Sequence, residues 1–439
     1  MMLSPPILII SLDATRYDYL VDSAGNFTRS FFKKFAGRAH HFTHAFTPSP
    51  WTPPAHASLF TGLAPGEHGV VEGQLWLDNH IPTLAGFLGE RGYRTIGISS
   101  NPLLGPVTHL NKDFHSFFEV WKNPKHLRQA AQFLRFDDII LNSGQVEEKV
   151  LEILGSELNE TSEEPVFLFL QLIGPHNPYQ PSQTALAKRV GIYPDEVWER
   201  VTHYNRDWRY YYADGRKMTS REQHLLRELY QAELDDLNSS LEHLFALPWF
   251  QHAMEAGHVI ITADHGEMLG EYNHIHHLFN LYNPLIHIPL LWHEPNQQAQ
   301  ISHDAFIQHQ HIFPLIRRLL AGEENALTEW SSDAPGFIVA QLQEPVEILQ
   351  GLDQVNPHAG DEFRHHQIAI QDHSRKVIWH STGRHECFHI NNGLSEDQNL
   401  FPEKARDFQT QLNECERIYN STQNKPSRVD EMMWKLGYF

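Results

Sequence analysis

Five short apolar segments, each ending in polar residues, constrain the fold of this chain more than any other feature. None of them alternates between apolar and polar positions, which is typical of strands buried on both faces of a parallel sheet. Amphipathic, helix-like patterns lie between them, including 80–92 and 220–247. We therefore expect an α/β fold in which a large, mostly parallel sheet is flanked by helices on both faces. The five segments span residues 7–20, 93–101, 165–176, 257–267 and 287–295.

The sequence pattern changes after residue 295. Helical patterns around 304–321 are followed by residues 362–393, which have the alternation and turns of short, half-buried antiparallel strands. We therefore predict a large α/β domain over residues 1–325. A smaller C-terminal α+β subdomain with an antiparallel sheet is predicted over residues 326–439.

Charge and composition limit the classes of partner. The chain has 54 acidic and 34 basic residues, a formal net charge of −20. This balance disfavours binding to nucleic acid or to an anionic membrane, and we expect neither partner. An anionic small molecule is still compatible, because one metal ion can reverse the charge of a pocket. Only Cys387 and Cys415 are present, which argues against a disulfide framework.

The N-terminal segment "MMLSPPILIISLD" is expected to be the first strand. It lacks a basic region and a cleavage site after small residues, and its apolar run is too short to span a membrane. These features predict a cytoplasmic chain with no signal peptide and no transmembrane segment. The sequence does not indicate the oligomeric state.

Polar side chains follow several of the strand-like segments. Ligands of parallel sheets bind beyond the carboxyl ends of the strands, so Asp13, His176, Asp264 and His265 should converge there. A single acid in such a place more often caps a helix or a turn. Three such groups together (Asp13, Asp264 and His265) favour a site for one divalent metal ion. This donor set favours Zn or Mn, with Ca or Mg as alternatives.

Thr52 lies before Pro53 and Pro54, where the run "AHASLFTG" begins a predicted helix. A hydroxyl at a helix N-terminus lies near backbone N–H groups that attract an anion. When bound to a metal, such a hydroxyl can lose its proton and attack phosphorus or sulfur. A plain helix cap explains Thr52 equally well at this stage.

Several motifs in order along nearly the whole chain resemble the sulfatase branch of the alkaline phosphatase superfamily. "TPPAHASLFTG" is similar to the family's nucleophile motif, in which Cys or Ser precedes x-Pro-x-Arg and a run ending in Thr-Gly. Five other segments resemble motifs that the family has before and after its nucleophile. They are "SLDATRYDYL", "GPHNPY", "TADHGEMLGEY", "HHLFNLYNPLIHIPLL" and "FHINNGLSEDQNLF". The resemblance implies an alkaline phosphatase-like fold with a sulfatase-like catalytic domain over 1–325. It also implies metal ligands at Asp13, Thr52, Asp264 and His265, and catalytic roles for Thr52, His56, His176 and His277.

Four positions depart from the sulfatase pattern. Sulfatases oxidise Cys or Ser to formylglycine, but the methyl group on Cβ of Thr52 prevents formation of that aldehyde. The hydroxyl of Thr52 would instead act directly, as in related phosphodiesterases. Ala14 stands where many sulfatases have a second Asp, and His56 and Ser100 stand where they have Arg and Lys. The loss of two cations reduces electrostatic stabilisation of an anionic transition state.

We therefore predict a metal-dependent hydrolase that cleaves a small anionic phosphate ester, either a phosphodiester or a phosphonate monoester, through Thr52. Three alternatives stay open: a sulfatase that uses unmodified Thr52, a phosphoryl or sulfuryl transferase, and an inactive binding relative. The leaving-group pocket is expected within residues 100–135 and 186–219. The second segment is rich in Trp and Tyr and is interpreted as an insertion near the mouth of the site.

Overall fold

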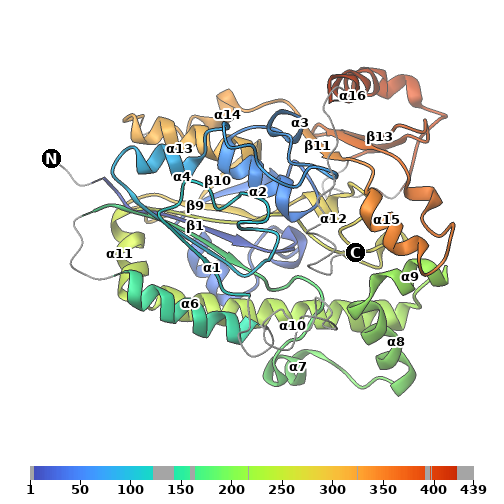
Figure 1. Ribbon diagram of the computed structural model, residues 1–439, viewed down its shortest axis with the longest axis horizontal. Coiled ribbons are helices and arrows are strands. Elements are labelled where there is room, and N and C mark those ends of the chain that lie inside the picture. Colours follow the sequence, from blue (N-terminus) through green and yellow to red (C-terminus); the bar gives the residue numbers. More distant parts are fainter. Residues whose placement is uncertain are drawn as a thin grey trace.

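A mixed sheet of eight strands runs through the centre of the computed structural model, which describes residues 4–121, 143–158, 164–215, 217–323, 325–390, 396 and 398–422 (Figure 1). The strand order is β10-β2-β9-β6-β1-β5-β3-β4. The five adjacent strands from β6 to β4 are all parallel, which confirms the predicted fold class. The strands are β1 (Ile7–Leu12), β2 (His40–Phe46), β3 (Arg94–Ser99), β4 (Ser116–Glu119), β5 (Val166–Leu172), β6 (His258–Ala263), β9 (Leu290–His293) and β10 (Ile301–Gln308).

Two segments of this sheet differ from the sequence prediction. Strand β9 is antiparallel to both β6 and β2, although its apolar run resembled the parallel strands. An apolar run shows that a strand is buried on both faces but does not show its direction, so the sequence pattern could not distinguish the two pairings. The chain between β6 and β9 includes the short helix α12 (Asn283–Ile286). Residues 304–308, predicted to be helical, complete strand β10, because pairing with β2 buries Phe306 and Ile307.

Helices cover both faces of the sheet (Figure 1). Leu8, Ile10 and Leu12 of β1 belong to one hydrophobic core, and Ile7 and Ile9 belong to a second. Both faces are therefore buried, which explains why the strands show no alternation. The first core includes side chains of α1 (Ser30–Ala36), α6 (Ser143–Glu157), α10 (Ser220–Phe245) and α11 (Pro248–Ala256). The second includes side chains of α2 (Thr52–Thr61), α4 (Leu84–Gly89) and α13 (Ile312–Leu320).

The 26-residue helix α10 lies along one side of the molecule (Figure 1). Its start is fixed by a capping box, in which Thr219 Oγ1 accepts from the backbone N–H of Glu222 while Glu222 Oε2 accepts from that of Thr219. Leu226, Leu229 and Tyr230 recur at helical spacing on its buried face. Among the described residues, no helix combines the length and apolar character needed to cross a membrane.

Most of residues 186–219 is helical rather than irregular. It forms part of α7 (Gln183–Arg189), then α8 (Asp195–Arg206) and α9 (Trp208–Asp214). Tyr204 and Tyr211 are buried in the same core as α10. These two tyrosines therefore contribute to packing, whereas Tyr210 of the same segment is exposed.

The second sheet is antiparallel, in the order β11-β12-β13-β14, and confirms the predicted C-terminal sheet. Ile368 and Ile370 of β12 face helix α16, whereas Ala369 packs towards Phe306 of the large sheet. The elements are β11 (Ile338–Leu342), β12 (Gln367–Gln371), β13 (Arg375–His380), β14 (Glu386–His389) and α16 (Gln409–Thr422). Residues 391–395 and 397 of the sequence motif "FHINNGLSEDQNLF" (388–401) lie outside the described residues.

The division of the chain into two domains near residue 325 remains a prediction.

A buried ion pair joins the small sheet to the segment before α12. Lys376 Nζ of β13 lies 2.5 Å from Glu396 Oε1 and donates to Leu281 O at 2.7 Å. The backbone N–H of Asn283 donates to Glu396 Oε2 at 2.9 Å. These contacts connect β13 and Glu396 to residues 281–283, and breaking the pair would leave a buried charge without its partner at a cost of about 3–5 kcal/mol.

Candidate active site

The carboxyl ends of β6, β1, β5 and β3 meet at one edge of the large sheet. Leu12, the last residue of β1, pairs with Ala263 of β6 and Leu172 of β5. The residues that follow, Asp13 and Asp264, are therefore neighbours. One ligand atom each from Asp13, Asp264 and His265 lies within 4.8 Å of the others, and all three side chains are buried.

Asp13 is held by two amide side chains. Its Oδ2 accepts from Asn101 Nδ2 at 2.8 Å and from Gln171 Nε2 at 2.7 Å. Its Oδ1 is buried and has no hydrogen-bond partner among the described residues. One carboxylate oxygen is thus fixed by the protein while the other is free to bind a ligand.

Asp264 and His265 are held in the same manner. Asp264 Oδ1 accepts from the backbone N–H groups of Ala14 at 3.1 Å and His265 at 2.9 Å, whereas its buried Oδ2 has no hydrogen-bond partner among the described residues. His265 Nδ1–H donates to Gly266 O at 2.8 Å, which leaves a lone pair on Nε2.

The three candidate ligand atoms, Asp13 Oδ1, Asp264 Oδ2 and His265 Nε2, have the spacing of metal ligands. His265 Nε2 lies 3.6 Å from Asp13 Oδ1 and 3.5 Å from Asp264 Oδ2. Tetrahedral bonds of about 2.0–2.1 Å would place ligand atoms roughly 3.3 Å apart. Two buried carboxylate oxygens without partners and one imidazole lone pair therefore fit a divalent cation.

The electrostatics of the cluster agree with that fit. Burial, together with the negative charge of Asp264, raises the pKa of Asp13 well above its usual range. Burial opposes ionisation of Asp264 as well, but His265 and His56 hold its pKa below the ordinary value. Burial also lowers the pKa of His265 to about 4, so its ring is neutral at pH 7 and suited to bind a metal.

Thr52 begins helix α2, and its hydroxyl faces this cluster. The N-cap position belongs to Trp51, whose backbone is extended, and Pro53 and Pro54 occupy the first turn. Thr52 Oγ1 accepts from Asn101 Nδ2 at 3.3 Å, and its hydroxyl donates to His265 Nε2 at 3.4 Å. The hydroxyl therefore points at the candidate metal ligands, which a simple helix cap would not require.

His56 lies one turn later in α2, and both of its ring nitrogens bind protein groups. Nδ1–H donates to Thr52 O at 2.9 Å, so Nε2 carries a lone pair that accepts from Ser11 Oγ at 2.9 Å. The ring is buried, and its Nδ1 lies 3.8 Å from Asp264 Oδ2. His56 thus connects β1 to the backbone of Thr52.

His176 and His277 lie beside His265. The ring centroids of His277 and His265 are 4.3 Å apart, and those of His277 and His176 are 4.9 Å apart. His277 Nδ1–H donates to Glu267 Oε1 at 3.0 Å, and burial lowers the pKa of His277 well below its ordinary value. His176 Nδ1–H donates to Asn177 O, and its side chain is half-buried.

Sequence reasoning missed three residues of the site. Asn101 ends the segment 93–101, Gln171 is a single polar residue within the apolar strand β5, and Glu267 follows His265 by two positions. Asn101 Oδ1 accepts from the backbone N–H of Leu103 at 2.8 Å, which fixes the orientation of the amide. Ser100 donates to Gln171 O at 2.9 Å and therefore supports the strand instead of replacing a cationic group.

The Sulfatase family model matches residues 5–322. The chain belongs to the sulfatase family. An uncharacterized sulfatase of Escherichia coli strain K12, YidJ, is 22% identical over 344 residues, which cover 72% of this chain. The match spans 66% of that relative's own length, just under two thirds.

Solved structures of this sulfatase fold match over nearly the whole chain. A phosphonate monoester hydrolase from Silicibacter pomeroyi has a TM-score of 0.68 and 17% identity, covering 96% of both chains. BT4656, solved in complex with its substrate D-glucosamine-2-N,6-O-disulfate, has a TM-score of 0.68 and 13% identity, covering 96% of this chain and 100% of its own. At these identities the likeness shows the fold alone.

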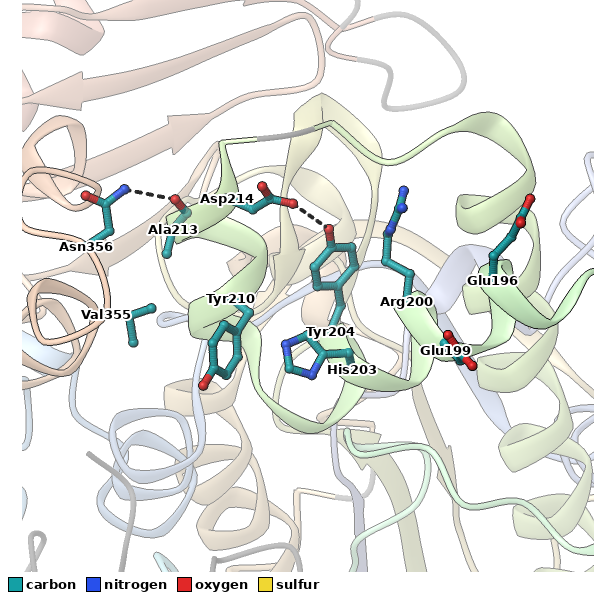
Figure 2. Close-up of a pocket in the computed structure, with 10 residues that line it drawn as sticks. All are labelled: Glu196, Glu199, Arg200, His203, Tyr204, Tyr210, Ala213, Asp214, Val355 and Asn356. Carbon is teal, nitrogen blue, oxygen red and sulfur yellow. Dashed lines mark hydrogen bonds between the residues drawn. The ribbon is translucent and has the colours of Figure 1, made fainter.

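Two surface cavities lie among the helices and the small sheet. Figure 2 shows one of about 670 Å³ beside α8 and α9, lined in part by Glu196, Glu199 and Asp214. These acidic side chains do not suit an anionic ester. The other cavity, of about 380 Å³, is lined by residues of 211–217, 272–282 and the C-terminal sheet, among them Lys217, Tyr272 and Tyr282.

Proposed function

We propose that this sulfatase-family chain is a metal-dependent hydrolase of a phosphate ester, a phosphodiester or a phosphonate monoester, with Thr52 as the nucleophile. The observation that carries the proposal is the position of Thr52 Oγ1, 3.4 Å from His265 Nε2 beside the free oxygens of the two aspartates. The β-methyl group of Thr52 excludes the aldehyde that sulfatases form from Cys or Ser. A phosphonate monoester hydrolase has the same fold, as does a protein that binds a sulfated sugar, so the choice of a phosphate ester depends on Thr52.

A divalent ion held by Asp13, Asp264, His265 and Thr52 would lower the pKa of the threonine hydroxyl and polarise a nonbridging oxygen of the substrate. One imidazole with two carboxylates favours Zn or Mn, with Ca or Mg as alternatives. Asn101 holds both Asp13 and Thr52, so it fixes the nucleophile relative to the ligands. His56 fixes the backbone of Thr52 from the buried side.

The reaction would proceed in two displacements. The Thr52 hydroxyl gives up its proton and Oγ1 bonds to phosphorus, while the bond from phosphorus to the leaving oxygen breaks. That oxygen departs with the electron pair and takes up one proton, so no proton is gained or lost overall. Water then attacks the Thr52-phosphoryl ester, which releases the product and restores the hydroxyl. His176 and His277 are proposed to bind the anionic group and to exchange the proton with the leaving oxygen.

The cavity of about 380 Å³ is the best candidate for the leaving group. Its lining includes His274, three residues before His277, and Tyr211, Tyr212 and Lys217 from the aromatic segment 186–219. Glu362 and Glu386 also line this cavity, so its aromatic rings are proposed to contact the organic leaving group and not the anionic centre. Residues 122–135, the later part of the other segment expected to form this pocket, lie outside the described residues.

A sulfate ester is the second candidate substrate, because the family model itself is that of the sulfatases. In that case Thr52 would attack sulfur without prior modification. The two functions are separated by comparing kcat/KM on two aryl esters with the same leaving group. One ester is a phosphate or phosphonate and the other is a sulfate. A kcat/KM at least about tenfold higher for the sulfate than for the phosphate or phosphonate ester would make the sulfate ester the first candidate substrate.

The test of the mechanism compares Thr52→Ala with Thr52→Ser on the best substrate of a panel of phosphate monoesters, diesters, phosphonates and sulfates. We expect T52A to lower kcat/KM by at least about 10³-fold and T52S to retain a measurable part of it. Rapid quenching followed by mass analysis should find a phosphoryl group on Thr52 of the wild type. Full turnover by T52A would exclude the threonine nucleophile. Chelation should abolish turnover, and Zn or Mn should restore it.

A further inference from the structure

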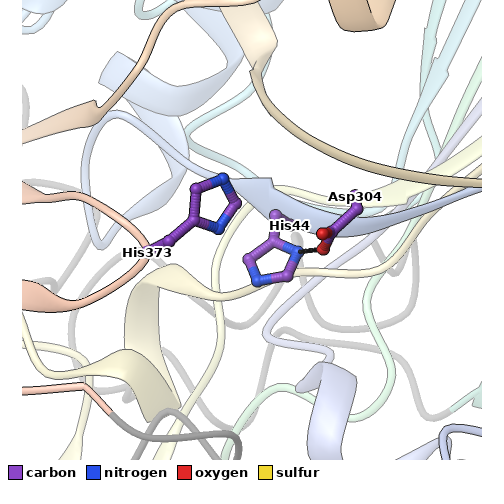
Figure 3. Close-up of side chains that lie close together, drawn as sticks. All are labelled: His44, Asp304 and His373. Atoms are coloured by element: carbon purple, nitrogen blue, oxygen red, sulfur yellow. Dashed lines mark ion pairs between the residues drawn. The ribbon is translucent and has the colours of Figure 1, made fainter.

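We propose a second divalent metal site, formed by His44, Asp304 and His373, that takes a first-row transition ion such as Zn²⁺ (Figure 3). One ligand atom from each residue lies within 4.8 Å of the others. Within the described ranges, this cluster and the active-site cluster are the two groups of three such residues that meet this condition. The proposal does not depend on the hydrolase mechanism, because the two clusters share no residue.

A β-bulge brings the first two ligands together. Strands β2 and β10 pair in parallel, with Phe42 opposite His303 and His44 opposite Phe306. Two residues of β10, Asp304 and Ala305, therefore face one residue of β2, and the extra residue changes the direction of the neighbouring side chains. As a result, Asp304 Oδ1 lies 3.0 Å from His44 Nδ1.

The third ligand comes from the small sheet. His373 lies in the turn between β12 and β13, where Asp372 Oδ1 accepts from the backbone N–H groups of Ser374 and Arg375, each at 2.8 Å. Its ring stacks on buried Phe306, with centroids 4.3 Å apart and planes at 29°. The centroids of His373 and His44 are 5.0 Å apart. The bulge and the turn thus place two imidazoles and a carboxylate around one point.

The ligand types and the solvent exposure of this cluster suit a metal ion that keeps some coordination positions for water. Two imidazoles and one carboxylate suit Zn²⁺ and other first-row ions, whereas Ca²⁺ and Mg²⁺ prefer oxygen. Asp304 is 86% exposed and His373 is exposed, so an ion can enter and water can complete its coordination. His358 and Asp361 offer a contrast, because their exposed side chains pair (Nδ1 to Oδ2, 3.1 Å) but form no such group of three with any other described residue.

An ion at this site would cross-link the two sheets. His44 and Asp304 belong to β2 and β10 at the edge of the large sheet, whereas His373 belongs to the β12–β13 turn. The unfolded chain does not hold these three residues together, so binding would stabilise the folded state. The expected role of the metal is therefore structural.

Calorimetric titration of the metal-free full chain with Zn²⁺ tests the site, using His373→Ala and the matched control His358→Ala. We expect H373A to bind one equivalent fewer than the wild type and H358A to bind the same number. This difference is expected whether or not the active site also takes Zn²⁺. Zn²⁺ should also raise the melting temperature less in H373A than in H358A, while hydrolysis at saturating metal stays unchanged.

Asp304→Asn provides an independent variant, because it keeps the shape of the side chain and lies on the surface. We expect D304N to raise the Kd of that same equivalent at least about tenfold. Co²⁺ offers a second probe, since its visible absorption at this site should be lost in H373A. Equal Zn²⁺ stoichiometry and affinity in wild type, H373A and D304N would overturn the proposal, as would a wild type whose bound Zn²⁺ is lost entirely on substitution of Asp13 alone.

Discussion

At the scale of single residues, Asn101 shows how the site is organised. Its Nδ2 donates to Asp13 Oδ2 and to Thr52 Oγ1, while Leu103 fixes the other end of the amide. One side chain thus sets the distance between a candidate metal ligand and the candidate nucleophile. Buried carboxylate oxygens on the other side of Asp13 and Asp264 are left free for a cation.

We expect Asn101→Ala to lower kcat by about 10- to 100-fold, the usual cost of losing a partner that orients a metal ligand. The fold should persist, because Asn101 belongs to no hydrophobic core. Steady-state kinetics with increasing metal would show the loss, and the metal concentration for half-maximal activity should rise. The exposed Asn356→Ala serves as the matched control. Unchanged kcat and metal dependence in N101A would contradict the arrangement.

At the scale of elements, the turn after β6 determines where the ligands lie. Gly266 follows Asp264 and His265, and its backbone N–H donates to Leu285 O at 2.7 Å. A Cβ atom built at Gly266 would lie 2.0 Å from Pro284 O of α12. Only glycine therefore allows the ligand turn to pack this closely against α12.

Gly266→Ala should displace this turn from α12. We expect at least about a tenfold loss of metal affinity and a fall of roughly 1–3 kcal/mol in the free energy of unfolding. Metal titration and denaturant unfolding would measure the two effects. Gly155→Ala is the control, since a Cβ at that exposed position of α6 meets nothing within 4 Å and should leave both quantities unchanged or slightly improved. Equal behaviour of G266A and G155A would refute the packing argument.

At the scale of the whole molecule, several buried histidines are neutral at pH 7 because burial lowers their pKa. Burial lowers the pKa of His41, His258 and His287 to about 4 each, from an ordinary value of about 6.5. The unfolded chain therefore binds protons between pH 6.5 and pH 4 that the folded chain does not. Stability must rise with pH across this window and fall as the solution is acidified.

We expect the urea midpoint to drop steeply between pH 7 and pH 5. Each such histidine contributes roughly 1 kcal/mol of destabilisation at pH 5.5. Urea unfolding of the metal-free chain at several pH values measures the effect, and exposed His358→Gln should not change it. If the free energy of unfolding is constant from pH 7 to pH 5, these histidines take up protons equally in the folded and the unfolded chain, and the prediction is wrong.

The sequence by itself determined the mostly parallel sheet, the positions of Asp13, Asp264 and His265 at strand ends, and the place of Thr52 at the start of a helix. These features depend on local burial and on the order of motifs, which a single chain displays directly. The antiparallel direction of β9, the strand at 304–308 and the contacts of Asn101, Gln171 and Glu267 were decided only in the tertiary structure. Each of these depends on a partner far away in the sequence. The cluster of His44, Asp304 and His373 depends in addition on a bulge and on the docking of two sheets, and hydrophobic periodicity encodes neither of them.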